Sequence, residues 1–188
     1  MAEHVILTAG PMGAGKTTAI RSLSEIEVVS TEAVNTDRAT VDKDTTTVAL
    51  DYGEITLGDS DKVRLYGLPG QRRFDFMWDI LRKRAVGLML LIKGDAPDAL
   101  DMLTDFLDEF AEMHERGAIV IGITHCDKSE TPSLAAFADR TRLATDDALV
   151  PVFQVDARSR ADMQTCLISL VANVEMNAIL RSNKEVAA

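Results

Sequence analysis

Four short apolar segments recur along the chain without the polar alternation of a half-exposed strand. They occupy residues 5–7, 86–92, 118–123 and 150–155. Strands that are covered on both faces of a parallel sheet have this pattern. Between them, apolar residues recur with helical period at Ala99, Leu103, Phe106, Leu107 and Phe110, and again at Met163, Cys166, Leu167, Leu170, Val171 and Val174. The alternation of strand and helix predicts a three-layer, doubly wound α/β domain.

One region departs from this alternation, because only residues 58–61 separate two apparent strands at 48–57 and 62–68. Four residues leave no room for a helix, so we expect a β-hairpin with one strand running antiparallel at the sheet edge. Residues 31–45 are polar and without periodicity, which predicts a mobile surface loop. No repeat or linker is evident, so we expect one domain over residues 1–182 and a short tail over 183–188.

Composition narrows the possible partners. The 188 residues carry a formal net charge of −10, a field that repels nucleic acid and anionic membranes. An anionic ligand would therefore need a local site of positive character. Cys126 and Cys166 lie far apart without metal spacing, which favours a reducing, cytoplasmic location. The apolar run at 86–92 is too short to span a bilayer, and no membrane anchor is evident.

The sequence Gly10-Pro-Met-Gly-Ala-Gly15-Lys16-Thr17 has the spacing of a phosphate-binding loop. Its glycines let backbone N–H groups converge on one anion, and the following helix directs its positive end to the same point. Lys16 can bridge the β and γ phosphates, and the Thr17 hydroxyl can ligate Mg²⁺. The loop lies between an apolar strand and a segment of helical character at 17–23, as such a loop requires. The alternative is an ordinary Gly-rich turn.

Two further segments have the composition of nucleotide-dependent switches. Thr45-Thr46-Thr47 ends the polar loop, and Gly67-Leu-Pro-Gly70-Gln71 follows the second hairpin strand. Taken alone, the first is equally consistent with β-propensity and the second with a Pro-Gly turn. Their order and spacing after the phosphate loop favour switches.

Together these elements resemble the small Ras-like GTPases, most closely the bacterial MglA-type branch associated with Roadblock operons. The residues that carry the resemblance are the phosphate loop, 47–53 (TVALDYG), 65–71 (LYGLPGQ) with Phe74, and 124–127 (THCD). The resemblance implies a P-loop NTPase fold of the small G-protein type, with a mostly parallel six-stranded sheet and one antiparallel edge strand. It also implies Mg²⁺-dependent, slow hydrolysis of GTP to GDP, switch loops at 31–47 and 68–74, and a Roadblock/LC7-type regulator or effector.

The same resemblance assigns roles to the switch residues. Thr47, or its neighbour Thr46, would close on Mg²⁺ and the γ-phosphate. The backbone N–H of Gly70 would contact the γ-phosphate, and Gln71 would orient the attacking water. The expected catalytic residues are therefore Gln71, Lys16 and Thr47, and the expected metal ligands are Thr17 and Thr47.

One position departs from the pattern of many P-loop enzymes, which hold Mg²⁺ with an Asp three residues before the switch II glycine. That position is Gly67 in this chain. We hypothesise that Asp51, an acidic residue in a mostly apolar strand of the hairpin, replaces the missing carboxylate through water. The alternative is an edge-strand Asp that faces solvent.

A guanine-reading carboxylate is expected at Asp127, directly after the apolar strand 118–123. Guanine offers N1–H and an amine to one carboxylate, whereas adenine has no such donor pair. The segment 124–127 resembles the guanine motif Asn-Lys-x-Asp, with Thr124 and His125 in its first two positions. Residues 156–158 resemble its partner motif Ser-Ala-Lys, in which the Ala157 N–H would contact the base. Alone, an Asp after a strand is more often a helix N-cap.

The complete set of expected nucleotide contacts is Gly10, Met12, Gly13, Ala14, Gly15, Lys16, Thr17, Thr18, Thr46, Thr47, Gly70, Thr124, His125, Asp127, Asp156, Ala157 and Arg158. The sequence predicts a small GTPase that acts as a molecular switch. Two other functions compete with it. The chain could be a nucleotide-binding scaffold that does not hydrolyse GTP, for which Gly67 and the altered base motif are the reasons. It could also be a P-loop ATPase.

Overall fold

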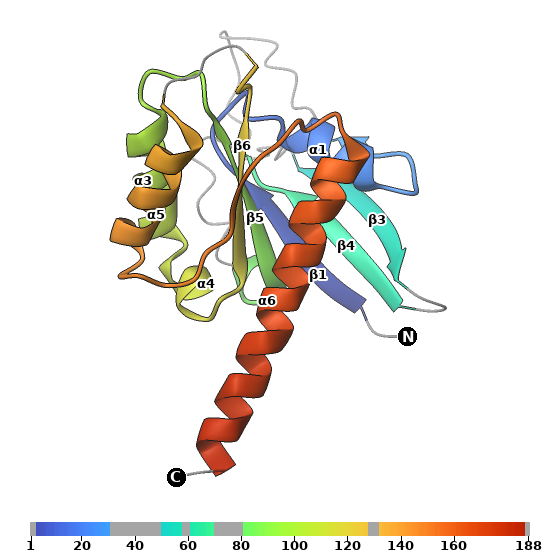
Figure 1. The fold of residues 1–188 in the computed structure, drawn as a ribbon. Coiled ribbons are helices and arrows are strands. Elements are labelled where there is room, and N and C mark those ends of the chain that lie inside the picture. The colour runs from blue at the N-terminus through green and yellow to red at the C-terminus, as the bar shows by residue number, and fades with distance from the viewer. Residues whose placement is uncertain (1–2, 31–49, 58–60, 70–80, 128–131, 187–188) are drawn as a thin grey trace, which may run out of the picture.

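The computed structural model describes residues 3–30, 50–57, 61–69, 81–127 and 132–186 (Figure 1). Seven strands form one sheet in the order β2-β3-β4-β1-β5-β6-β7. Their bounds are β1 Glu3–Ala9, β2 Val29–Ser30, β3 Asp51–Leu57, β4 Asp61–Gly67, β5 Ala85–Lys93, β6 Ile119–Thr124 and β7 Val152–Gln154. The strand β3 runs antiparallel to both neighbours, and the pairs from β4 through β7 are parallel.

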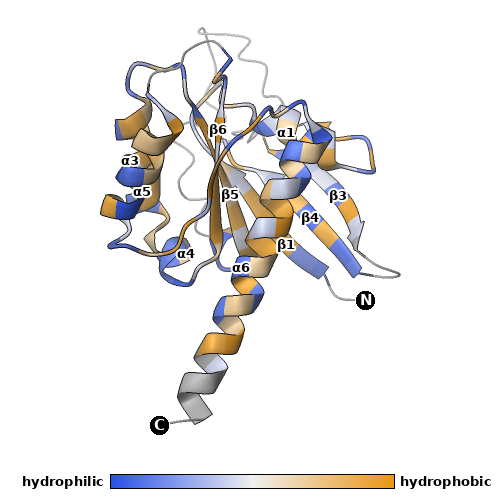
Figure 2. Cartoon of the chain, in the orientation of Figure 1, coloured by the Kyte–Doolittle hydropathy of each residue, from blue (hydrophilic) through white to orange (hydrophobic). Residues whose placement is uncertain are grey.

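Helices cover both faces of this sheet (Figure 1). Their bounds are α1 Lys16–Leu23, α3 Ala99–Glu109, α4 Ala111–Glu115, α5 Leu134–Ala144 and α6 Arg160–Val186. Helices α1 and α6 lie on one face, and α3 and α5 lie on the other. Successive residues of β1 point to opposite faces, so Ile6 joins the core under α1 and α6 while Leu7 joins the core under α3. Figure 2 shows the apolar strands between these layers.

The predicted fold class is confirmed, with one strand more than expected. The hairpin of β3 and β4 forms as predicted, but β3 is not the edge strand, because the two-residue strand β2 pairs with its outer side. Two residues are too few to show a periodic pattern, which is why the sequence did not predict β2. The predicted polar loop at 31–45 lies outside the described residues.

The helix α6 is longer than its predicted apolar stripe and continues past residue 182 to Val186. Its segment Arg160–Leu180 is long and apolar enough, by length and composition, to cross a membrane. Met163, Cys166 and Leu170 of that segment are buried against the sheet, as in the core helix of a globular domain. The second half of α6 extends beyond the body of the domain (Figure 1).

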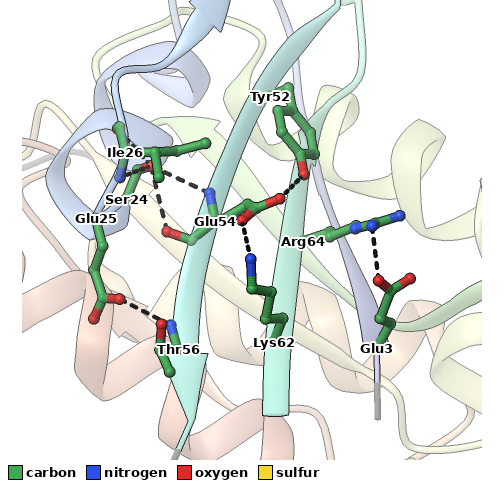
Figure 3. A network of polar contacts seen from close by, with 9 residues as sticks. All are labelled: Glu3, Ser24, Glu25, Ile26, Tyr52, Glu54, Thr56, Lys62 and Arg64. Atoms are coloured by element: carbon green, nitrogen blue, oxygen red, sulfur yellow. Dashed lines mark hydrogen bonds and ion pairs between the residues drawn. The ribbon is translucent and has the colours of Figure 1, made fainter. Parts of the chain in front are cut away.

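Polar contacts join the end of α1 to the hairpin (Figure 3). The Ser24 hydroxyl accepts a hydrogen bond from the Glu54 N–H at 3.2 Å, and the Glu25 N–H donates to the Glu54 carbonyl at 2.8 Å. On β3, the Tyr52 hydroxyl donates to the Glu54 carboxylate, which also pairs with Lys62 at 3.1 Å. Burial, with the Glu54 contact second, raises the pKa of Tyr52 to about 12, so this hydroxyl remains a donor. These contacts fix β3 relative to α1, and β3 begins at Asp51.

Candidate nucleotide site

The loop between β1 and α1 has a backbone that only glycine accommodates at two of its positions. Gly10 has a φ of +138°, and a Cβ there would lie 2.0 Å from the carbonyl oxygen of Leu91. Gly15 has a φ of +95°, and a Cβ there would lie 2.9 Å from the Cβ of Ala157. These close approaches let the loop wrap tightly between the sheet and the second predicted base loop.

The start of α1 is open to an anion. Gly15 caps the helix without a side-chain hydrogen bond, and no acidic residue lies in the first turn. The first N–H groups of a helix lack intrahelical partners, and its N-terminus carries partial positive charge. The loop and helix therefore supply the local positive site that a protein of net charge −10 needs to bind phosphate.

Lys16 lies at the centre of this loop. Its Nζ donates to the carbonyl oxygens of Gly10 and Pro11, both at 2.8 Å. Burial lowers the pKa of this ammonium to about 8, and the negative charge of Asp51 partly opposes the shift. A phosphate placed against the loop would stabilise the charged form and raise the pKa again.

We expect nucleotide binding to weaken as pH rises through about 8, because the Lys16 ammonium is present below this pKa and lost above it. Phosphate groups, with a second pKa of about 6, remain ionised over this range. The association constant for GDP is expected to fall about fivefold between pH 8 and 9. Calorimetry in two buffers of different ionisation enthalpy would also detect proton uptake on binding at pH 8.5.

The control is Lys16→Arg, whose guanidinium does not titrate in this range. Any GDP affinity that this variant retains should be constant from pH 8 to 9. Binding by the unmodified protein without proton uptake at pH 8.5 would contradict the assignment of the pH dependence to Lys16.

The carboxylate of Asp51 lies directly beside the metal-ligating position of the loop. The Thr17 hydroxyl donates to its Oδ2 at 2.5 Å. Asp51 pairs with Gly67 in the β3–β4 register, and a Cβ on Gly67 would lie 3.0 Å from the Asp51 Cβ and 3.2 Å from Oδ2. The Asp51 side chain thus fills the space beside Gly67, next to the position where other P-loop enzymes carry their Asp.

The oxygens of Thr17 and Asp51 are the hard donors that Mg²⁺ prefers, so these residues fit the metal that the fold implies. Among the described residues, no group of three or more His, Cys, Asp or Glu side chains could hold a metal by itself. The predicted ligand Thr47 lies outside the described residues, as do Thr46, Gly70 and Gln71.

The first predicted base loop follows β6 and is joined to the phosphate loop. The buried hydroxyl of Thr124 donates to the carbonyl oxygen of Ala14 at 3.0 Å. The same hydroxyl lies 3.0 Å from Nδ1 of His125, a residue with a φ of +60°. Asp127 follows at the carboxyl end of the strand and is exposed. Asp127 thus lies three residues after Thr124, whose hydroxyl is hydrogen-bonded to the phosphate loop.

The second predicted base loop follows β7 and is held by two acidic side chains. Asp156 accepts bonds from the Arg158 guanidinium, the shortest at 2.7 Å. Its backbone N–H donates to Oδ2 of Asp162 at 2.8 Å. The hydrogen bonds from Arg158 lower the pKa of Asp156 to about 2. Ala157, whose N–H was predicted to contact the base, is buried and faces Gly15.

The structure therefore joins the phosphate loop to both predicted base loops, through Thr124 with Ala14 and through Ala157 with Gly15. Met12 of the phosphate loop is 70% exposed. The sequence did not predict two residues that hold parts of this site in place. Ser30 donates to Oδ1 of Asp51 at 2.6 Å, and Asp162 anchors the second base loop. Asp162 carries a sequence signal, since an acidic residue in the first turn of a predicted helix commonly binds nearby N–H groups. Ser30 carries none.

Comparisons with known proteins agree with this fold and place the chain in a family. An uncharacterized protein of Methanocaldococcus jannaschii, MJ1339, is 28% identical over 122 residues, which are 64% of this chain and 68% of that protein. The structure of the small GTPase Arl6 (BBS3) from Trypanosoma brucei, with bound nucleotide analogue GppNp, has a TM-score of 0.67 and 11% identity, and the match covers 94% of this chain and 99% of that chain. This likeness is one of fold, and the fold is that of a small GTPase.

A family model described as a conserved hypothetical ATP binding protein matches residues 24–185. The match begins after the phosphate loop and covers the predicted switch segments and both predicted base loops. Because it spans most of the chain, the protein belongs to this family of conserved hypothetical ATP-binding proteins.

Proposed function

We propose that this protein is a guanine-nucleotide switch that binds GTP with Mg²⁺ and hydrolyses it slowly to GDP and phosphate. The observation that carries the proposal is the attachment of both predicted base loops to one phosphate loop. The Thr124 hydroxyl bonds the Ala14 carbonyl at 3.0 Å, and Ala157 lies against Gly15. A nucleotide with its phosphates on Lys16 would therefore have its base near Asp127.

The choice of guanine rests on Asp127. A carboxylate accepts hydrogen bonds from N1–H and the exocyclic amine of guanine together, and adenine presents no matching pair. The ring of His125, which directly precedes Cys126 and Asp127, is the side chain available to cover the base where Ras-like proteins carry a Lys. The ion pair of Asp156 and Arg158 lies within the second predicted base loop and stabilises its conformation.

Among the described residues, one set would bind the phosphates and another would bind the metal. Lys16 and the N-terminus of α1 bind the phosphate chain and offset its negative charge. Thr17 and Asp51 would hold Mg²⁺, with Asp51 in the role that an Asp at position 67 has in other P-loop enzymes. Bound there, Mg²⁺ would supply positive charge to the phosphate oxygens.

Hydrolysis and signalling are proposed for the segments 31–47 and 68–74. Gln71 would orient the attacking water, Gly70 and Thr47 would contact the γ-phosphate, and its release would free both segments. We expect slow turnover without a partner, since enzymes of this class gain much of their rate from groups supplied in trans. A Roadblock/LC7-type protein is the partner that the resemblance to MglA-type GTPases suggests.

A P-loop ATPase is the second candidate, and the description of the family as ATP binding favours it. It would use the same phosphate loop with a different base contact. A scaffold that binds but does not hydrolyse is the third candidate, since Gly67 removes the usual metal-holding Asp. Retention of Gln71 and the position of Asp51 beside Thr17 favour hydrolysis.

Direct binding and turnover separate these candidates. We expect GTP and GDP to bind at least about tenfold more tightly than ATP, and Mg²⁺ to strengthen GTP binding. Phosphate release from GTP should be measurable and should fall at least about tenfold in Gln71→Ala, while GDP affinity stays the same. Tighter binding of ATP than of GTP, together with phosphate release from ATP, would establish the ATPase class. Tight GTP binding without phosphate release, alone or with a partner, would establish the scaffold.

A further inference from the structure

Ser30 contacts the carboxylate that we assign to the metal site. Its hydroxyl donates to Oδ1 of Asp51 at 2.6 Å, while Thr17 donates to Oδ2 at 2.5 Å. Each of the two oxygens thus accepts a hydrogen bond from a hydroxyl, one from α1 and one from β2. In the β2–β3 register Ser30 stands directly across from Asp51. Directly opposed strand residues have neighbouring Cβ atoms, so the backbone itself brings the hydroxyl to the carboxylate.

The position of β2 is itself fixed from α1. Beyond the last residue of that helix, the Ser24 and Glu25 contacts with β3 hold the chain that leads to Val29 and Ser30. The Glu25 carboxylate also accepts from the Thr56 N–H at 3.0 Å. The chain just before β2 is therefore attached to β3 at Ser24 and Glu25, and β2 itself pairs with β3, although the Ser30 side chain is exposed.

We propose that Ser30 is a positioning residue for the metal-dependent binding of nucleotide. It keeps the Asp51 carboxylate turned so that Oδ2 stays on Thr17. The terminal torsion of an Asp side chain is broad, so one hydroxyl contact alone leaves the carboxylate free to rotate. The hydroxyl of Ser30 on Oδ1 removes that freedom. Gly67 leaves room for the carboxylate but offers no donor side chain to orient it. This proposal rests on the assignment of Asp51 to the metal site made above.

A positioning role for Ser30 also explains how the Asp51 carboxylate on β3 could hold the metal in place of a carboxylate at position 67 on β4. An Asp at position 67 would belong to a central strand that β1 holds on its other side. Asp51 begins the outer strand of the hairpin and has only β2 beyond it. The hydrogen bond from Ser30 is a second contact that holds the Asp51 carboxylate, in addition to the one from Thr17. Groups that orient metal-holding side chains typically contribute 10–100-fold to affinity.

The test compares the dissociation rate of a fluorescent GDP in excess Mg²⁺ with the rate in EDTA. Fluorescent ADP replaces it if the binding experiment above favours adenine. The rate in EDTA divided by the rate in Mg²⁺ isolates the metal contribution, because a general loss of structure accelerates both. We expect Ser30→Ala to reduce this ratio about tenfold, mainly by faster release in Mg²⁺. Ser30→Thr, which retains the hydroxyl, should restore it.

Two further variants make the result specific. Ser22→Ala removes a hydroxyl that donates to the Ala19 carbonyl within α1 at 2.8 Å, and it should leave the ratio unchanged. Asp51→Asn should reduce the ratio at least as much as Ser30→Ala. A ratio near one in the unmodified protein would overturn the metal assignment of the proposed function. A large ratio that falls in Asp51→Asn but not in Ser30→Ala would overturn only the role of Ser30, and so would equal acceleration in Mg²⁺ and EDTA.

Discussion

Replacing Asp127 with Asn is expected to lower the affinity for GTP by at least about 100-fold, or roughly 3 kcal/mol, and to create affinity for XTP. The carboxylate of Asp127 would accept two hydrogen bonds from guanine, and hydrogen bonds to charged groups contribute about 1.5–3 kcal/mol each. The amide of Asn places an NH₂ donor against the guanine amine, so one bond is lost and two donors oppose each other.

Xanthine reverses this mismatch, because it carries a carbonyl where guanine carries the amine. The Asn side chain would accept from N1–H and donate to that carbonyl. Competition of XTP, GTP and ATP against a fluorescent nucleotide would measure all three affinities in the parent protein and in Asp127→Asn. The affinity for ATP should not change, since adenine presents no donor pair to either side chain.

Asp156→Asn is the matched control for this exchange. It removes one negative charge from the neighbouring loop, where Asp156 pairs with Arg158 at 2.7 Å rather than with the predicted base position. It should lower nucleotide affinity without creating XTP binding. If Asp127→Asn weakens ATP and GTP equally, Asp127 has no role in reading the base and the ATPase class is favoured.

The phosphate loop and the order of elements could be predicted because both are local. The eight-residue phosphate loop can be recognised from contiguous sequence between an apolar strand and a helix. Strands that are covered on both faces can be recognised as continuous apolar runs. The same holds for Asp127, which follows its strand directly. The structure confirms the strand–loop–helix arrangement around Lys16 and the hairpin of β3 and β4.

The contacts around Asp51 could be predicted only in part, because they join residues distant in sequence. The acidic residue in an apolar strand and the missing Asp at Gly67 pointed to Asp51, but the direct hydrogen bond from Thr17 was not predicted. The expected action of Asp51 on Mg²⁺ through water stays a prediction. The strand β2 has two residues and no periodicity, so Ser30 could not be assigned to any site. Its role follows only from the register of β2 on β3.

Gly67→Asp, which restores the residue found at this position in many P-loop enzymes, is expected to destabilise this protein by about 2–4 kcal/mol. A Cβ at Gly67 would lie 2.9 Å from Cδ1 of Ile20 and 3.0 Å from the Cβ of Asp51. The Ile20 atom ends a flexible side chain and can move, whereas the Asp51 Cβ is fixed to the backbone of β3. Two carboxylates would also face each other across the strand pair, so one would take up a proton or both would repel.

Moving the carboxylate from β3 to β4 should therefore recover much of that loss. In the double variant Gly67→Asp with Asp51→Gly, the fixed Cβ contact and the second charge are both absent. Denaturant unfolding of the parent, both single variants and the double variant gives a coupling free energy, which we expect to exceed about 1.5 kcal/mol in favour of the pair. Adding Asp51→Asn to Gly67→Asp separates charge from volume, because it removes the repulsion and keeps the Cβ. Additive effects of the two single substitutions would show that Asp51 does not occupy the place of the missing carboxylate, and the assignment of Asp51 to the metal site would lose its structural basis.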